Sequence, residues 1–223
     1  MQIASYIDHT ILKADTTLAD IEKVCAEAVE YGFASVCIPP YFVPESVKRV
    51  TGSEVKVATV IGFPFGYHHY SAKVAEAVQA VNEGADELDV VMNIAAFKNG
   101  DFDLLEKEIT GIAGAAKPAG VLIKVIIESG ILNEAQIIRC CNFYKDFPVD
   151  FLKTSTGYAE KGASLEAVRL MRHHLPPAIH VKASGGIRTF EFAKSLVDAG
   201  AGRLGCSAGV AIVKGQTATG LSY

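Results

Sequence analysis

The sequence predicts an α/β protein whose strands close into a (β/α)8 or TIM barrel. Short runs of apolar and β-branched residues recur about every 30 residues, and helical patterns separate them. Most of these runs are near-continuously apolar, which is typical of parallel strands that helices cover on both faces. One strand–helix unit repeated eight times in 223 residues fits a closed barrel better than an open doubly wound sheet.

Eight segments are expected to form the strands. They are residues 6–9, 34–38, 56–61, 87–92, 121–127, 150–154, 180–183 and 202–206. Their centres lie 22 to 35 residues apart, which leaves room for a helix in each interval. Neither a linker nor a low-complexity segment interrupts the pattern, so residues 1–223 are expected to form one barrel domain.

Helices are expected where apolar residues return at helical spacing. The first follows Asp15-Thr16-Thr17, whose side chains can cap its N-terminus, and it ends at Gly32. The others are expected at residues 72–81, from 102 up to Lys117-Pro118, and at 134–144, 164–174, 189–199 and 207–213.

The charge balance argues against several classes of partner. The chain has 21 lysines and arginines against 25 aspartates and glutamates, a formal net charge of −4 at pH 7. Nucleic-acid binders need basic surfaces, so none is predicted here. No uncharged apolar run reaches the length of about 18 residues that suggests a membrane span. No basic segment followed by an apolar one marks a signal peptide, so we expect a cytoplasmic protein without a membrane partner.

The five cysteines are expected to be reduced thiols that serve as small packing residues. Their number is odd, none forms a CxxC pair, and Cys140 and Cys141 are adjacent. Cys37 allows a second interpretation, in which it reaches a pocket, because it ends an apolar run beside Pro39-Pro40.

Three lysines lie inside the expected strands, namely Lys124, Lys153 and Lys182. Lysine is almost never fully buried without a partner, because removing an ammonium group from water is costly. A structural ion pair, or a stem that reaches out to a strand end, would explain any one of them. Three on neighbouring strands of a barrel would converge on one interior, which indicates a functional site.

Lys153 and Lys182 lie near the C-terminal ends of their strands, where barrel enzymes build their active sites. Two ammonium groups in a partly desolvated cleft repel each other, which lowers the pKa of an amine below about 10.4. A neutral lysine attacks a carbonyl carbon and forms a Schiff base, while a protonated neighbour acts as an acid. Lys124 would add to the same electric field.

Two aspartates lie between apolar neighbours in expected strands, Asp8 in the first and Asp89 in the fourth. Either residue would serve as the ion-pair partner of a buried lysine. The functional alternative makes Asp89 a proton shuttle that works with Lys182.

Glycines in the last two loops favour an anion site. Gly185 and Gly186 let backbone N–H groups approach a phosphate closely. Gly205 and Ser207 come before a short helix whose N-terminus attracts anions. Barrels commonly bind phosphate at this position, although the glycines would also suit simple tight turns.

Other motifs indicate neither a cofactor nor a metal. The GxGxxG pattern at residues 200–205 leads into a strand, whereas a dinucleotide-binding motif follows one. His68 and His69 lack further ligands at metal-binding spacing, and with Tyr67 they are expected in a solvent-facing loop.

The sequence resembles the deoxyribose-phosphate aldolase family of class I aldolases over essentially its whole length. The matching segments include residues 6–12, 62–66, 87–91 and 124–128. The most specific ones are Phe-Leu-Lys-Thr-Ser-Thr-Gly at 151–157 and Lys-Ala-Ser-Gly-Gly-Ile-Arg at 182–188.

The resemblance implies reversible cleavage of 2-deoxy-D-ribose 5-phosphate to acetaldehyde and D-glyceraldehyde 3-phosphate, without metal or cofactor. It assigns the Schiff base to Lys153, the assisting ammonium group to Lys182 and the proton relay to Asp89. Rival interpretations remain open. They are another Schiff-base barrel aldolase, a non-covalent sugar-phosphate isomerase that uses Asp8 and Asp89, and a catalytically silent phosphate-binding barrel.

The resemblance also implies substrate contacts. Residues expected to shape the sugar pocket or touch the substrate are Asp8, Thr10, Thr156 and Lys124, with the neighbourhood of Cys37. Gly185, Gly186, Gly205 and Ser207 are expected at the phosphate. The last residue, Tyr223, resembles a tail tyrosine that assists proton exchange; the alternative is a frayed chain end. The family favours dimers or tetramers, so a homo-oligomer is expected.

Two positions depart from some family members. Tyr158 stands where some carry a phosphate-facing lysine, and Ala208 stands where some carry a second serine. Both substitutions bear on phosphate affinity rather than on the chemistry at Lys153.

Overall fold

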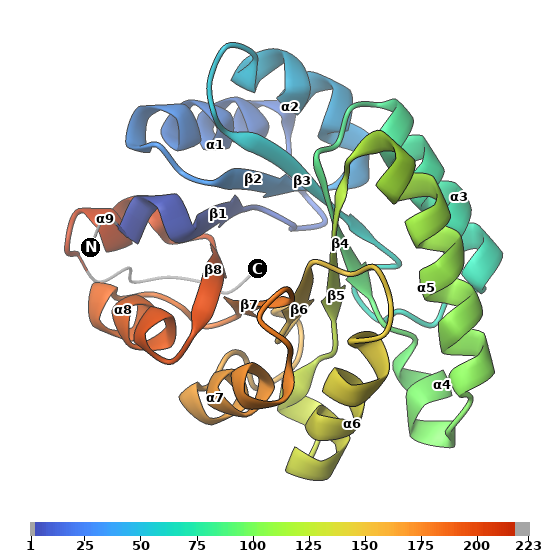
Figure 1. Ribbon diagram of the computed structural model, residues 1–223. Coiled ribbons are helices and arrows are strands. Elements are labelled where there is room, and N and C mark those ends of the chain that lie inside the picture. Colours follow the sequence, from blue (N-terminus) through green and yellow to red (C-terminus); the bar gives the residue numbers. More distant parts are fainter. Residues whose placement is uncertain (1–2, 217–223) are drawn as a thin grey trace.

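Eight parallel strands pair in chain order, and the last pairs with the first to close a barrel (Figure 1). The computed structural model describes residues 3–216. The strands are β1 Ile7–Thr10, β2 Ser35–Ile38, β3 Lys56–Ile61, β4 Glu87–Val91, β5 Leu122–Ile126, β6 Phe151–Lys153, β7 His180–Ser184 and β8 Ala201–Cys206. All eight lie where the apolar runs predicted them, so the (β/α)8 prediction is confirmed.

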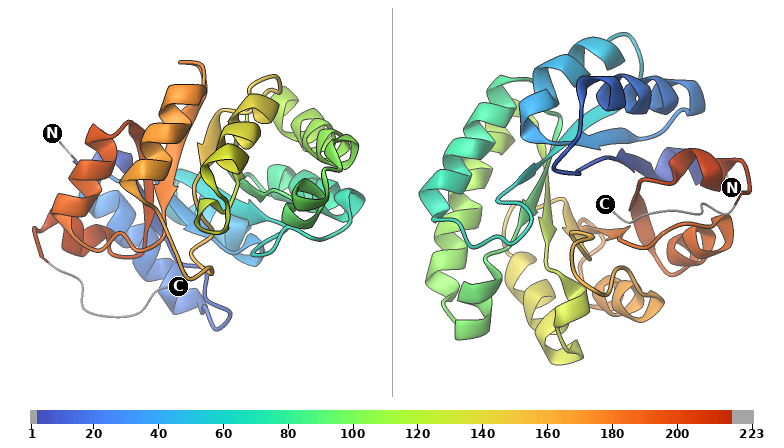
Figure 2. Two further views of the ribbon diagram at one scale, coloured as in Figure 1. Left: turned by 90° about the horizontal axis from the view of Figure 1, so that it is seen from below. Right: turned by 180° about the vertical axis from the view of Figure 1, so that it is seen from behind.

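Helices surround the barrel on every side, as two further views show (Figure 2). They are α1 Leu18–Tyr31, α2 Val43–Val50, α3 Tyr70–Asn82, α4 Ile94–Asn99, α5 Phe102–Ala116, α6 Glu134–Tyr144, α7 Leu165–His174, α8 Phe190–Asp198 and α9 Gly209–Val213. Short 3-10 helices lie at Ile3–Tyr6, Pro40–Phe42, Lys117–Ala119 and Ser129–Ile131. The first of these packs beside α9, next to the seam where β8 meets β1. Among the described residues, no helix is long and apolar enough to cross a membrane.

The helix α1 shows how local chemistry sets an element's limits. The Thr17 side chain accepts a hydrogen bond from the backbone N–H of Asp20, and the Asp20 carboxylate accepts one from the N–H of Thr17. This reciprocal capping box satisfies N–H groups that no earlier turn can reach. Gly32 ends the helix in the left-handed conformation, with φ of 65°, that glycine adopts without a steric penalty.

Two short helices were not predicted, and one was predicted too long. The eight-residue α2 contains Pro44 in its first turn, and the six-residue α4 is too short to show a clear period. The last helix begins at Gly209 rather than Ser207, because the chain turns at Ala208 without a side-chain cap.

The barrel interior divides into an apolar part and a charged part. Leu12, Cys37, Ala58 and Val60 form an apolar cluster against which Phe63 packs. The strands β4 to β8, together with β1, send ionised side chains inward instead. Because most barrels fill this space with Val, Ile and Leu, the charged interior marks the candidate site.

Candidate active site

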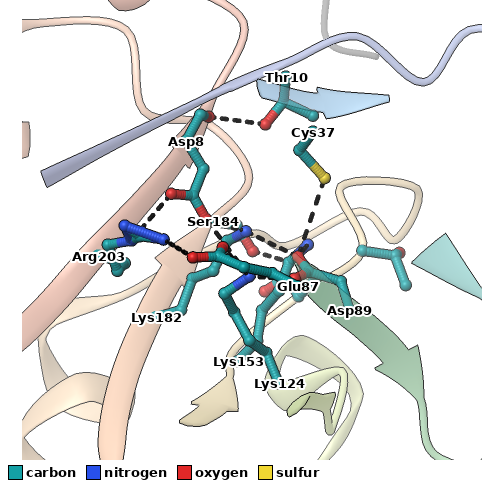
Figure 3. A network of polar contacts seen from close by, with 12 residues as sticks. Asp8, Thr10, Cys37, Glu87, Asp89, Lys124, Lys153, Lys182, Ser184 and Arg203 are labelled. Carbon is teal, nitrogen blue, oxygen red and sulfur yellow. Dashed lines mark hydrogen bonds and ion pairs between the residues drawn. The ribbon is translucent and has the colours of Figure 1, made fainter. Parts of the chain in front are cut away.

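Seven ionisable side chains meet inside the barrel (Figure 3). This group, called here the charged cluster, comprises Asp8, Glu87, Asp89, Lys124, Lys153, Lys182 and Arg203. Six strands supply its members, and the most exposed side chain among them is that of Arg203, at 13%. The structure therefore brings together all three predicted lysines and both predicted aspartates.

Asp89 lies at the centre of the cluster. Its Oδ2 atom lies 2.7 Å from Nζ of Lys153 and 2.7 Å from Nζ of Lys182. Its Oδ1 atom accepts a hydrogen bond of 2.8 Å from Nζ of Lys124. Burial alone would raise the pKa of this carboxyl, but the three ammonium groups hold the pKa of Asp89 well below its ordinary value.

Lys182 also lies 2.5 Å from the Asp8 carboxylate. Burial lowers the pKa of an amine, but Asp8 and Asp89 outweigh burial and raise the pKa of Lys182 well above its ordinary value. Its role as the lysine that keeps its proton agrees with this direction.

Further ion pairs in the cluster involve Lys124, Glu87 and Arg203. Lys124 lies 2.5 Å from Glu87, and the Arg203 guanidinium contacts both Glu87 and Asp8. The pKa of Lys124 is raised, because Asp89 and Glu87 together outweigh the effect of burial. The side chain of Lys124 is fully buried, and its three ionic contacts in the cluster are all with carboxylates.

The sequence interpretation missed Glu87 and Arg203. A signal for Glu87 was present, since it precedes Asp89 by two residues and side chains two apart on a strand share a face. Arg203 had the same signal as the lysines, a single charge inside a short strand.

Lys153 has the fewest ionic partners in the cluster, because Asp89 is the one carboxylate within ion-pair distance of it. Four basic groups face three acidic groups in the cluster, an excess of one positive charge when all are ionised. A covalent bond formed at Lys153 would therefore break a single ion pair of the cluster, that with Asp89.

The loop after β6 makes hydrogen bonds to two neighbouring loops. The Thr156 hydroxyl donates to the Glu128 carboxylate and accepts from the backbone N–H of Tyr158. The Tyr158 hydroxyl donates to the Leu12 carbonyl, 2.9 Å away, and its ring meets that of Phe63 edge-on. Tyr158 thus links the loops that follow β6, β1 and β3.

Of the predicted phosphate residues, Gly185, Gly186 and Ser207 lie in the loops after β7 and β8, whereas Gly205 lies within β8. Gly185 and Gly186 both have positive φ, 88° and 77°, so two consecutive residues adopt the left-handed conformation. Gly186 and Ser207 are exposed, whereas Gly185 and Gly205 are buried. A Cβ atom on Gly205 would lie 3.1 Å from Cε of Lys182, so this glycine makes room for the lysine side chain.

The other predicted residues near the sugar pocket lie beside the cluster. Thr10, 3% exposed, donates through its hydroxyl to the carbonyl of Asp8. Cys37 lies with its Sγ atom 3.9 Å from Oδ2 of Asp89, and burial and that carboxylate raise the pKa of its thiol. All five cysteines are free and buried, as predicted.

The loop that contains His68 and His69 faces solvent, as the sequence predicted. Tyr67, His68 and His69 are exposed, and the His69 ring caps α3 by accepting from the N–H of Ser71. Within residues 3–216, no group of three or more His, Cys, Asp or Glu side chains could hold a metal ion. The predicted role of Tyr223 falls outside the described residues.

Residues 2–215 match the family described as DeoC/LacD family aldolase, which is nearly the whole chain. The chain belongs to this aldolase family. Curated members similar to it include deoxyribose-phosphate aldolases from Caldanaerobacter subterraneus subsp. tengcongensis and from Brevibacillus brevis. The first is 48% identical over 99% of this chain and 96% of its own length, and the second is 44% identical over the full length of both.

Solved structures agree with this DeoC/LacD family assignment. A tetrameric deoxyribose phosphate aldolase from Aeropyrum pernix superposes with a TM-score of 0.89 at 32% identity, covering 95% of this chain and 89% of that one. This DeoC/LacD family member is thus an aldolase with an eight-stranded barrel. Six of the seven residues of its charged cluster lie in the segments that carry the family resemblance, and Arg203 lies outside them.

Proposed function

We propose that this aldolase reversibly cleaves 2-deoxy-D-ribose 5-phosphate to acetaldehyde and D-glyceraldehyde 3-phosphate through a Schiff base on Lys153. The observation that carries the proposal is the contact of Lys153 and Lys182 with one oxygen of Asp89, 2.7 Å from each. The substrate is taken from the names of relatives that share up to 49% of their residues with this chain.

In the proposed cycle, neutral Lys153 attacks C1 of the open-chain sugar and forms a carbinolamine. Loss of water gives a protonated imine, which draws electrons from the C2–C3 bond as that bond breaks. The C3 hydroxyl loses its proton, glyceraldehyde 3-phosphate leaves, and an enamine remains on Lys153. Protonation of the enamine at its former C2 and hydrolysis of the resulting imine release acetaldehyde.

Proton movements in this cycle fall to the groups beside Lys153. Lys182 keeps its proton in the free enzyme, and Asp89 bridges it to the nucleophile. A proton can therefore pass between Lys182 and the reacting nitrogen through Asp89 or a water held by it. The left-handed pair Gly185-Gly186 would present backbone N–H groups to the phosphate.

The isomerase alternative is less compatible with these carboxylates. An acid–base pair made of Asp8 and Asp89 needs one carboxyl that holds a proton near neutral pH. Burial works in that direction, but Lys182, Arg203 and Lys124 lower the pKa of Asp8 to about 2, and that of Asp89 is also well below its ordinary value. A Schiff-base aldolase acting on a ketose phosphate remains the second candidate, because it would use the same lysine.

Borohydride reduction in the presence of deoxyribose 5-phosphate, followed by intact-mass measurement and peptide mapping, tests the proposal. We expect a reduced two-carbon or sugar-phosphate adduct on Lys153. An adduct on Lys182 or Lys124 would keep the aldolase and reverse the lysine roles. If the sugar phosphate binds in a separate assay and no adduct forms, the Schiff-base mechanism is wrong. Adduct formation with ketose phosphates but not with deoxyribose 5-phosphate would support the second candidate.

Two further properties remain predictions. A homodimer or homotetramer is supported by the tetrameric relative, and light scattering of the purified chain would measure it. A cytoplasmic location is expected from the sequence alone.

A further inference from the structure

Glu128 lies two residues after the end of β5 and has an unusual backbone conformation. Its φ and ψ are 53° and 58°, and it is the one residue other than glycine with positive φ between residues 3 and 216. A glutamate pays about 1 kcal/mol or more for this conformation, which is found mostly where surrounding structure or function requires it. The side chain is 4% exposed, so a carboxylate is held in the protein interior as well.

The Glu128 carboxylate binds a single residue, Thr156, at two of its atoms. The Thr156 backbone N–H lies 3.3 Å from Oε1 and 3.2 Å from Oε2, and the Thr156 hydroxyl donates to Oε2. Thr156 lies three residues after Lys153, and the Lys153 charge is close enough to act on Glu128. The strained glutamate therefore holds the loop that follows β6, the strand that carries Lys153.

This contact determines how Thr156 can meet a substrate. Its hydroxyl hydrogen is used by Glu128, and one lone pair is used by the N–H of Tyr158. A hydroxyl has one donor and two acceptor sites, so one acceptor site is left. Thr156 would accept a hydrogen bond from a sugar hydroxyl, but it would not donate one.

We propose that Glu128 is a positioning residue that orients the Thr156 hydroxyl as an acceptor for a hydroxyl group of the sugar substrate. The inference rests on the proposed function, because it needs a hydroxylated aldehyde bound at Lys153. The proposed role predicts different effects on two aldehydes. The reaction of the sugar phosphate would depend on Glu128 through Thr156, whereas that of acetaldehyde would not, because acetaldehyde has no hydroxyl group to donate to Thr156.

The variant Glu128→Gly separates this role from a structural one. Glycine adopts positive φ without strain, which offsets part of the stability lost with the hydrogen bonds to Thr156, so the temperature of unfolding should fall by no more than about 4 °C. We expect kcat/KM for deoxyribose 5-phosphate to fall about tenfold, as for loss of one hydrogen bond worth about 1.4 kcal/mol. The rate of imine formation with acetaldehyde should stay within about twofold of the wild-type rate. Glu128→Gln keeps an acceptor oxygen for Thr156 and should recover much of the loss.

A double-variant cycle with Thr156→Val tests whether Glu128 acts through Thr156. If it does, Glu128→Gly combined with Thr156→Val should be no slower than Thr156→Val alone. The proposal would be overturned if the two substitutions reduced kcat/KM independently, so that the loss in the double variant equalled the product of the two single losses. An unchanged kcat/KM in Glu128→Gly would overturn it too. An equal loss of imine formation with acetaldehyde would also overturn it, because Glu128 would then act on Lys153. If the proposed function itself were wrong, the result would differ, because borohydride reduction of the wild-type enzyme with deoxyribose 5-phosphate would give no adduct on Lys153.

Discussion

Lys153 and Lys182 occupy paired positions on β6 and β7, and their ammonium groups reach the same carboxylate oxygen, Oδ2 of Asp89. The pairing of two short strands thus places two cations side by side, and one anion holds them there. Lys182 has a second carboxylate in Asp8, whereas Lys153 shares its one carboxylate with two other cations. This asymmetry gives two chemically identical side chains different numbers of ion pairs, and the second carboxylate helps to raise the pKa of Lys182.

Replacement of the nucleophile should abolish catalysis. We expect Lys153→Arg to lose all measurable turnover and all borohydride-trapped adduct, because a guanidinium group stays protonated and cannot form an imine. The matched control is Lys194→Arg on the exposed face of α8, where arginine can keep the ion pair with Asp198. Residual turnover above about 1% of wild type in Lys153→Arg would move the Schiff base to another lysine.

Removal of the neighbouring cation should change the pH dependence. In Lys182→Leu we expect the pH–rate profile to shift to higher pH, because Lys182 no longer repels a proton on Lys153 and both aspartates lose a partner. The maximal rate should also fall about 100-fold or more, as for loss of a general acid. Rates measured from pH 5 to 10 would test this, with Lys194→Leu as the control. An unshifted profile would remove Lys182 from the reaction.

The stability of the fold should depend on Asp8 in acid. Although burial acts in the opposite direction, Lys182 and Arg203 lower its folded-state pKa to about 2 from an ordinary value of 3.8. A lowered pKa stabilises the fold above the unfolded value, by about 2 kcal/mol here, and this stability is lost as pH falls from about 5 towards 2. Urea unfolding at pH 6, 4 and 3 should therefore show the advantage of wild type over Asp8→Asn shrinking with acid. A constant difference would contradict the lowered pKa.

Gly205 offers a test that separates lysine placement from phosphate binding. In Gly205→Ala, the added Cβ would lie 3.0 Å from Cβ of Ser184 and 3.1 Å from Cε of Lys182, so Lys182 must shift. We expect imine formation with acetaldehyde, which carries no phosphate, to slow several-fold. Gly114→Ala is the control, since its Cβ meets open space in α5 and should add up to about 1 kcal/mol of stability. A defect confined to phosphorylated substrates would assign Gly205 to the phosphate alone.

Tyr158 should stabilise the barrel mouth. In Tyr158→Phe the ring can still pack on Phe63, but the hydrogen bond to the Leu12 carbonyl is lost. The free energy of unfolding should fall by about 1 kcal/mol. Tyr41→Phe, at a side chain that is 86% exposed, should change it by less than about 0.5 kcal/mol. Equal urea midpoints for Tyr158→Phe and wild type would show that the bridge adds nothing.

The sequence by itself determined the order of strands and helices, because apolar periodicity and capping residues are local properties. It also singled out Lys124, Lys153, Lys182, Asp8 and Asp89, since a charge inside a short apolar strand stands out without knowledge of its neighbours. The short helices α2 and α4 were not predicted from the sequence, because one or two turns carry too little periodicity to be detected.

Only the tertiary structure decided which charges meet. Asp89 lies opposite Lys124 across the β4–β5 pair, and Lys182 lies opposite Arg203 across β7 and β8. Barrel closure brings β1 beside β8, so Asp8 reaches Lys182 although 174 positions separate them in the sequence. These contacts set the direction of the Lys182 pKa, because the balance between repulsion and ion pairing depends on distances of a few ångströms. Strand register and barrel closure set those distances, and no local pattern of residues encodes them.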